Sequence, residues 1–582
     1  MRLEEYWGVG PKTADRLESE LGVAAAVDAI ESADVRALVD AGISRGRATR
    51  ILRRANGGEG MDALATDDAR AVYKDVVATA ADYAVTPGAA DRIRVLTPLP
   101  DRAAMEDRLD DVDAARETWR ALGEDARAAV LATFDAHDDA TDSTRAAVDT
   151  ALALRDALAD ADDVGVFASV ATLDRDALEE AADALQYLTD DGVAAGADAK
   201  LDRLRGRLED VERLERDTFD VLEAVRSQGV EGSDEFREAF VQYVATETGV
   251  EPRRVRDAAP PDAADAADFV STTLRALADD VRERVADHED DVAADLRGEL
   301  SAAREDVDAA VDAVGDLALD VSLARFAEAF DLARPAFVDR DALAVENARN
   351  LSLAADGVDV QPVTYAVGDH GLAHPPTGDR VAVLTGANSG GKTTLLETLC
   401  QVAVLARMGL PVPADGAEVG PVDAVVFHRR HASFNAGVLE ATLNSVVPPL
   451  AAGDRTLMLV DEFEAITEPG SAADLLHGLV TLTVDQEALG VFVTHLADDL
   501  EPLPETARTD GIFAEGLDRD LDLLVDYQPR FETVGKSTPE FIVSRLVADA
   551  GDRAERAGYE TLARAVGQQA VQRTLADAKW TE

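Results

Sequence analysis

A glycine-rich segment in the second half of the chain carries the most specific chemistry. It reads Gly386, Ala387, Asn388, Ser389, Gly390, Gly391, Lys392 and Thr393, with Thr394 directly after it. This is a complete GxxxxGK[ST] pattern between an apolar run and a helical pattern. Glycines let backbone N–H groups curl around phosphate oxygens, and the N-terminus of a helix adds a favourable dipole. We therefore predict that these residues bind ATP, that Lys392 acts in catalysis at the β- and γ-phosphates, and that the Thr393 hydroxyl coordinates Mg²⁺.

Two other apolar runs end in residues that would complete a hydrolytic site. Thr456–Val460 leads to Asp461 and Glu462, and Gly490–Thr494 leads to His495. Continuous apolar runs fit parallel strands buried on both faces, and the C-terminal ends of such strands share one edge of a sheet. We predict that Asp461 is the second Mg²⁺ ligand and that Glu462 orients or deprotonates the attacking water. His495 is predicted to hydrogen-bond to the γ-phosphate; the alternative is a capping histidine without a catalytic role.

The positions of the prolines predict which segments form the helices and strands that position these motifs. Residues 101–251 and 262–334 contain no proline and are rich in Ala, Leu, Arg and Glu, which favour helices. Apolar residues recur there every three or four positions, as in Leu201, Leu204, Leu208, Val211 and Leu214. We predict one helix over most of 262–334 and an antiparallel helical arm over about 195–310, with a bundle of shorter helices as the alternative. After Pro335, β-like runs alternate with glycine-rich turns and helical patterns, as in α/β domains.

Composition narrows the class of protein. The 582 residues include 57 basic and 115 acidic side chains, a formal charge of −58, yet 47% are hydrophobic, which argues against a disordered acidic chain. Acidic residues in every segment predict adaptation to molar salt. The single cysteine, Cys400, excludes an intrachain disulfide. We expect a cytoplasmic protein without a membrane span, because no leader-like segment and no apolar run of about 18 residues occurs.

The nucleotide motifs together resemble those of the MutS family of DNA-repair ATPases, within the wider ABC-type class. Asn388 takes the usual asparagine position of the MutS P-loop, and Asp461–Pro469 is similar to the Walker B motif and D-loop, with Thr467-Glu468-Pro469 most like the MutS2 branch. Val493–His495 matches the histidine switch of the family. Ser433 and Phe434 resemble the signature loop, so the resemblance implies that Ser433 contacts the nucleotide of a second subunit. The similarity is specific over about 319–545 and only architectural over about 100–318.

The N-terminus lacks the Phe-x-Glu wedge of the family's mismatch-reading domain. Two segments there, Tyr6–Ala14 and Leu38–Ile51, instead resemble paired helix-hairpin-helix units. Turns of this type present backbone N–H groups to a DNA phosphate without reading the bases. The predicted DNA contacts are Gly8, Gly10, Lys12, Arg45, Gly46, Arg47 and Arg50. A small helical protein–protein module is the alternative.

The resemblance implies a multidomain α and α/β chain with a C-terminal ABC-type P-loop ATPase domain. We expect a helix-hairpin-helix pair over 1–56, a helical lever and arm region over 57–335, an ATPase domain over 336–550 and a helical extension over 551–582. The expected function is a MutS2-like ATPase, most simply a homodimer, that clamps DNA without strong mismatch or sequence preference. No nuclease domain is expected. A cohesin-like DNA tether, an ABC transporter subunit and mismatch recognition with a partner protein remain alternatives.

Overall fold

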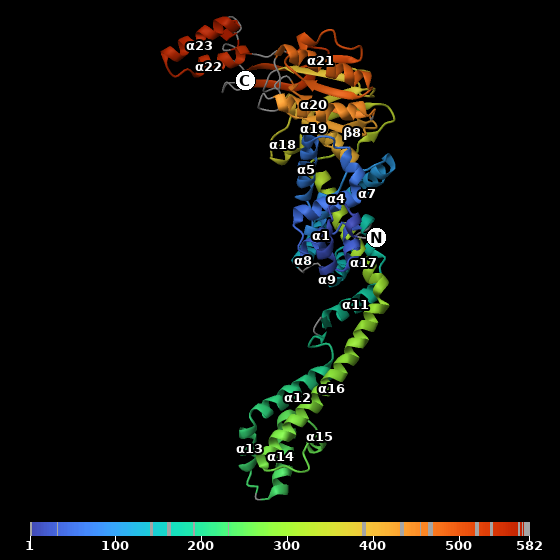
Figure 1. The fold of residues 1–582 in the computed structure, drawn as a ribbon, viewed down its shortest axis with the longest axis vertical. Helices are drawn as coiled ribbons and strands as arrows, with labels where there is room; N and C mark the ends of the chain where they lie inside the picture. The colour runs from blue at the N-terminus through green and yellow to red at the C-terminus, as the bar shows by residue number, and fades with distance from the viewer. Residues whose placement is uncertain are drawn as a thin grey trace. The chain divides into compact units, whose positions relative to one another are not determined.

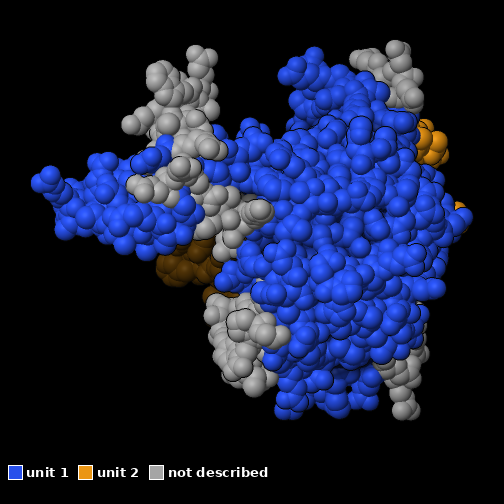
Figure 2. Space-filling model, turned by 90° about the horizontal axis from the view of Figure 1, so that it is seen from above, with its two compact units in different colours: residues 1–134, 161–166, 315–582 blue, residues 135–160, 167–314 orange. Residues whose placement is uncertain are grey.

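The computed structural model divides the chain into two compact units, which are coloured separately in Figure 2. Unit 1 comprises Met1–Phe134, Ala161–Val166 and Gly315–Glu582, and unit 2 comprises Asp135–Asp160 and Phe167–Val314. The structure describes residues 3–31, 33–139, 144–159, 164–189, 192–230, 232–386, 391–430, 436–453, 455–463, 469–517, 523–535, 539–567, 571–572 and 574. Among these residues, no helix combines the length and the apolar character that crossing a membrane requires.

A six-stranded sheet forms the centre of the C-terminal part of unit 1 (Figure 1). Its strands are β6 (Val381–Gly386), β8 (Ala424–His428), β9 (Thr456–Asp461), β10 (Leu489–Val493), β11 (Ala507–Leu517) and β12 (Leu523–Arg530). Their order is β12-β11-β6-β10-β9-β8, and every neighbouring pair is parallel except β11 and β12. The ends of β6, β9 and β10 therefore share one edge, as the apolar runs predict.

Alternation along β6 divides the core of this sheet into two layers, because successive side chains of a strand point to opposite faces. Ala382 and Leu384 pack with α19 (Lys392–Arg407) and α5 (Asp67–Ala81). Val381 and Val383 face the other layer, which holds α20 (Ala436–Ala451) and α21 (Pro469–Asp485). A short 3-10 helix, η4 (Ala497–Leu500), follows β10 on that side.

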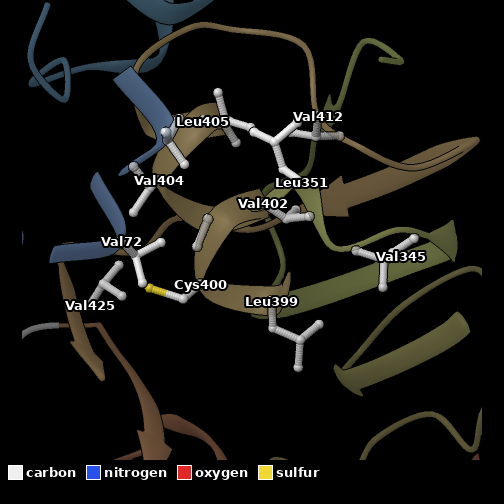
Figure 3. Close-up of a cluster of buried hydrophobic side chains, with 14 of the residues drawn as sticks. Val72, Val345, Leu351, Leu399, Cys400, Val402, Val404, Leu405, Val412 and Val425 are labelled. Atoms are coloured by element: carbon white, nitrogen blue, oxygen red, sulfur yellow. The ribbon is translucent and has the colours of Figure 1, made fainter. Parts of the chain in front are cut away.

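Helix α19 is buried around most of its circumference, and its buried residues include the polar Thr398 and Gln401 as well as the apolar run Val402–Ala406. Cys400 lies with Val72 of α5 and Val425 of β8 in this core (Figure 3). Burial raises the pKa of the Cys400 thiol, so this thiol is a packing group and not a nucleophile.

A four-stranded sheet, which the sequence pattern did not predict, lies beside the P-loop helix. It consists of β3 (Ala336–Phe337), β4 (Ala342–Ala348), β5 (Val363–Gly368) and β7 (Gly416–Val419), in the order β3-β7-β4-β5, with α18 (Leu351–Ala355) between β4 and β5. The Gln528 side chain joins the two sheets, since its Oε1 accepts from the Thr364 backbone N–H at 2.9 Å and its Nε2 donates to the Thr364 carbonyl at 2.8 Å.

The chain begins with a series of helices. They are η1 (Leu3–Glu5), α1 (Pro11–Glu20), α2 (Val23–Glu31), α3 (Val35–Asp40), α4 (Arg45–Asp62), α5, α6 (Pro87–Val95), α7 (Arg102–Ala121) and α8 (Glu124–Asp139). Of these, α5 packs against β8 of the larger sheet, while η1 and α1–α4 share a separate hydrophobic core. Thr66 caps α5 by accepting from the Ala69 N–H, and its hydroxyl also donates to the Phe427 carbonyl at 2.6 Å. The backbone N–H of Ala65 donates to the carbonyl of Val425, so residues from the predicted helical region extend the β8 edge of the sheet.

The described residues of unit 2 form helices and two short antiparallel strands. Its elements are α9 (Thr144–Ala157), α10 (Ala168–Ala171), α11 (Arg175–Tyr187), β1 (Leu188–Thr189), β2 (Gly192–Val193), α12 (Ala199–Arg216), α13 (Thr218–Arg226), α14 (Ser233–Thr248), α15 (Pro252–Asp257) and α16 (Ala266–Ala302). The 3-10 helix η2 (Gly165–Phe167) and helix α17 (Arg304–Ala329) cross the boundary between the units.

Helices α12 and α16 run antiparallel, as the arm prediction requires (Figure 1). Two side-chain contacts fix the direction, because Asp198 is hydrogen-bonded to His288 and Glu212 pairs with Arg282. The single helix predicted over most of 262–334 is wrong: α16 ends at Ala302 and α17 begins at Arg304. The segment before Pro252 is also divided, into α12, α13 and α14. The predicted arm region therefore combines one antiparallel pair of helices with shorter helices.

The C-terminal segment forms the helices α22 (Pro539–Asp549) and α23 (Arg553–Val566), which pack on each other. Asp552 caps α23 by accepting from two backbone N–H groups of its first turn.

Candidate active site

The strand–loop–helix unit places Lys392 at the end of the central strand. Gly386 ends β6 with a φ of 132°, and a Cβ there would lie 2.2 Å from the Ile512 carbonyl oxygen, so only glycine fits. Gly391 has a φ of 70° and precedes the first residue of α19. Lys392 is 3% exposed, and its Nζ donates to the Gly386 carbonyl at 2.8 Å. The Lys392 side chain thus reaches back to the first residue of the loop. The described residues do not include Ala387, Asn388, Ser389 and Gly390.

Thr393 and Asp461 meet beside this lysine. The Thr393 hydroxyl donates to Asp461 Oδ2 at 2.6 Å. Asp461 is 1% exposed, and its other oxygen, Oδ1, is buried without a hydrogen-bond partner among the described residues. Burial raises the pKa of Asp461, and the hydrogen bond from Thr393 opposes this rise. A hydroxyl and a carboxylate oxygen lacking a partner are the oxygen ligands that Mg²⁺ uses, so the residues present fit this ion.

Glu462 follows Asp461 in the left-handed region, with a φ of 40°. Its backbone N–H donates to the Val493 carbonyl at 3.0 Å, which anchors the residue to β10. The side chain has two nitrogen neighbours: His495 Nε2 lies 3.0 Å from Oε1, and the guanidinium Nη1 of Arg430 lies 2.6 Å from Oε2. The hydrogen bond from His495 lowers the pKa of Glu462, which favours the ionised form that can accept a proton from water.

A cavity of about 390 Å³ opens at the first turn of α19. Its lining residues are Ala348, Asn350, Leu353, Val358, Asp359, Val360, Gln361, Val363, Gly391, Lys392, Thr393, Thr394, Leu395, Thr398 and Tyr527. Asn350 fixes one wall, because its Oδ1 caps α18 while its Nδ2 donates to Thr398 Oγ1 at 3.2 Å. The mixture of apolar and amide groups suits a nucleoside next to a phosphate loop.

A buried polar network supports the base of the loop. Arg508 Nε donates to both carboxylate oxygens of Asp510, at 3.1 and 3.0 Å, and the Tyr365 hydroxyl donates to Asp510 at 2.8 Å. Thr385, the residue before Gly386, donates through its hydroxyl to the Asp510 carbonyl at 3.1 Å. Sequence reasoning missed this network, and the only signal was the Arg–x–Asp spacing in β11, where charged residues interrupt an otherwise strand-like pattern.

The structure brings Lys392, Thr393, Asp461, Glu462 and His495 together at one sheet edge, and Thr394 lines the adjoining cavity. Ser433, Phe434 and most of the predicted D-loop, residues 464–468, lie outside the described residues. Arg430 was not predicted as a site residue. Its position two residues after the end of β8, at the same edge as Asp461, was the available signal.

The N-terminal helices contain two turns of matching geometry. Gly8 and Gly42 both have a φ of 82°, and each precedes a helix, α1 or α4. Each turn is braced by an arginine from the other repeat: Arg47 donates to the Gly8 carbonyl at 3.2 Å, and Arg16 donates to the Gly42 carbonyl at 3.0 Å. Gly10 is the N-cap residue of α1 and supplies no side-chain hydrogen bond to the first turn of this helix.

The predicted DNA contacts are all exposed, but some of the basic side chains already have partners within the protein. Arg45 pairs with Asp91 at 2.7 Å, Arg47 donates to the Thr13 hydroxyl at 2.7 Å, and Arg50 donates to the Gly46 carbonyl at 3.2 Å. Lys12, Gly8, Gly10 and Gly46 are exposed as well.

Comparison with known proteins adds relatives for part of the chain. No family model matches it. It is 45% identical over 188 residues to the DNA-binding protein MutS2 of Pyrococcus furiosus, covering 32% of this chain and 34% of that protein. It is 31% identical over 212 residues to the DNA mismatch repair protein MutS of Granulibacter bethesdensis, covering 34% and 22%. It is 36% identical over 125 residues to the endonuclease MutS2 of Solidesulfovibrio magneticus, covering 20% and 16%.

The chain thus spans about a third of the first of these relatives and less of the other two. All three relatives are named as MutS or MutS2 proteins, the family that the motifs at the ends of β6, β9 and β10 resemble. Over the matched segments the chain is similar to MutS family proteins, and its identity to the MutS2 of Pyrococcus furiosus is 45%.

Proposed function

We propose that this protein is a MutS2-like ATPase that binds DNA and couples ATP hydrolysis to opening and closing a clamp. The observation that carries the proposal is the convergence of Lys392, Thr393, Asp461 and Glu462 at one edge of a parallel sheet. Support for DNA as the partner comes from the names of the relatives and from the exposed glycine turns.

In this proposal each residue has a separate task. Lys392 binds the β- and γ-phosphates after leaving the Gly386 carbonyl, and the cavity beside Tyr527 takes the nucleoside. Mg²⁺, held by Thr393 and Asp461, would neutralise phosphate charge. Glu462 accepts a proton from the attacking water, and His495 keeps the carboxylate ionised and oriented.

We propose further that two copies assemble, with Ser433 of each completing the nucleotide site of the other. DNA contact through exposed backbone N–H groups carries no base information, so perfect and mismatched duplexes should bind with nearly equal affinity. Some relatives are named endonucleases. The residues assigned here account for hydrolysis of ATP, and nicking of a supercoiled plasmid by the purified chain would reveal a further activity.

Equilibrium binding of radiolabelled ATP, with gel shifts of duplex DNA, tests both halves of the proposal. Lys392→Ala should abolish ATP binding, whereas Lys74→Ala, at an exposed lysine on α5, should bind like the wild type. Lys12→Glu with Arg50→Glu should weaken DNA binding at least tenfold, which corresponds to about 1.4 kcal/mol. Unchanged ATP binding in Lys392→Ala, or unchanged DNA binding in the charge-reversed variant, would contradict the respective half.

A further inference from the structure

Arg430 contacts the carboxylate that the proposed hydrolysis depends on, yet it belongs to none of the motifs. It lies two residues after the end of β8, the strand next to β9. Its Nη1 lies 2.6 Å from Glu462 Oε2, while His495 occupies Oε1 at 3.0 Å. Both carboxylate oxygens therefore have a side-chain partner, and the two partners follow the strands on either side of β9.

The neighbouring arginine shows that this contact is specific. Arg429 is directed to the other side of the strand, where it lies 3.3 Å from Glu397 and above the ring of Phe427. Consecutive residues in an extended segment point to opposite faces, so only one of the tandem arginines can reach Glu462.

The two ends of the ion pair differ in exposure. The Glu462 side chain is 10% exposed, whereas the Arg430 side chain is 55% exposed. A carboxylate withdrawn from water needs compensating charge, and an arginine can supply it from the solvent side at modest desolvation cost. Arg430 thus contacts Oε2 of Glu462 from the solvent-exposed side, whereas His495 contacts Oε1.

We propose that Arg430 is the positioning residue of Glu462, an inference that rests on the ATP hydrolysis proposed above. With Oε1 held by His495 and Oε2 by Arg430, the carboxylate plane is fixed before nucleotide binds. A general base needs this, because proton transfer depends on the geometry of base and water before it depends on pKa. The left-handed backbone of Glu462 adds to the need, since the surrounding contacts must hold a strained conformation.

The test measures kcat and KM for ATP hydrolysis by the full chain. Arg430→Met should lower kcat about tenfold or more with KM within about twofold, because the substrate-binding residues are untouched. The matched control is Arg530→Met, which removes a 53% exposed arginine that pairs with Glu515 on the same sheet; its kcat should equal the wild-type value.

A double-mutant comparison separates positioning from other roles. In a Glu462→Gln background, single-turnover rates should not fall further when Arg430→Met is added, because the group that Arg430 positions is already lost. An equal further fall, a wild-type kcat in Arg430→Met, or a raised KM with unchanged kcat would each overturn the inference. Thermal unfolding midpoints matching the wild type exclude misfolding. If the wild-type chain itself does not hydrolyse ATP, the proposed function fails before any variant is compared.

Discussion

The Thr393 hydroxyl lies 2.6 Å from Asp461 Oδ2, although the two residues are 68 positions apart in the chain. The contact joins the first turn of α19 to the end of β9, with β10 between β6 and β9 in the sheet. It also leaves the buried Oδ1 of Asp461 without a hydrogen-bond partner among the described residues. This relationship ties the phosphate loop to the carboxylates that follow β9.

The first prediction concerns the Thr393 hydroxyl. Thr393→Val keeps the shape of the side chain and removes the hydroxyl, so Mg²⁺-dependent ATP hydrolysis should fall at least tenfold and the Mg²⁺ concentration for half-maximal rate should rise. Thr393→Ser retains the hydroxyl and should stay within a few-fold of the wild type. A magnesium titration of phosphate release gives both quantities. Equal rates in the valine and serine variants would exclude the hydroxyl as a ligand.

The second prediction concerns Gly535, whose N–H donates to Thr385 Oγ1 at 2.6 Å. A Cβ at this position would lie 2.8 Å from the Thr385 carbonyl oxygen and 2.9 Å from Gly386 Cα. Gly535→Ala should therefore lower the free energy of unfolding by about 1–3 kcal/mol and weaken ATP binding. Gly516→Ala is the control, since its Cβ meets nothing within 4 Å. Urea unfolding compares the two, and equal stabilities would argue against this close approach.

The third prediction concerns a buried acid outside the site. Burial, and then the charges of Asp111 and Asp316, raise the pKa of Asp320 from 3.8 to about 7. Between those values the folded chain keeps a proton that the unfolded chain has lost, so the free energy of unfolding falls as the pH rises through this interval.

Asp320→Asn removes this effect and should raise the free energy of unfolding by about 1–3 kcal/mol near pH 8, with little change near pH 3. Asp312→Asn, at an exposed position of the same helix, is the control. Denaturation should be followed in molar KCl, which the acidic composition predicts the fold requires. A pH-independent difference between Asp320→Asn and the wild type would show that Asp320 keeps an ordinary pKa.

The sequence predicted which residues meet at one edge of the larger sheet, because that edge depends on local rules. An apolar run, a glycine loop and a helix with a lysine at its start are contiguous, and the polar residues after β9 and β10 must lie beside them once the strands are parallel. The antiparallel pairing of α12 and α16 also follows from periodicity. The break at Ala303 could not be found this way, because helix-forming residues continue on both sides of it.

The missed features rest on contacts between distant segments. Arg508 and Asp510 are two positions apart on β11, but Tyr365, whose hydroxyl donates to Asp510, lies on β5 of the smaller sheet. Arg430 reads as one of two consecutive arginines, and only the structure shows that it pairs with Glu462 while Arg429 pairs with Glu397. The smaller sheet was missed because β3 has only two residues and because β7, which lies between β3 and β4, follows them in the chain only after β6 and α19.

The fourth prediction tests the shared site. A dimer of one Ser433→Arg subunit and one Lys392→Ala subunit contains one composite site with an intact serine and an intact lysine. Mixed dimers should recover part of the ATPase activity that each variant lacks alone. Tandem affinity purification with two tags isolates the mixed species. No recovery in such dimers, or full activity of Ser433→Arg alone, would contradict a site shared between subunits.

The most direct test of the central claim is phosphate release from ATP by Glu462→Gln. Glutamine keeps the size of the side chain and can still hydrogen-bond to His495, but it cannot accept a proton from water. We predict that ATP binds as tightly as to the wild type while the turnover rate falls by about 100-fold or more. Glu124→Gln, at an exposed glutamate on α8, should leave the rate unchanged. Turnover by Glu462→Gln at the wild-type rate would contradict the account.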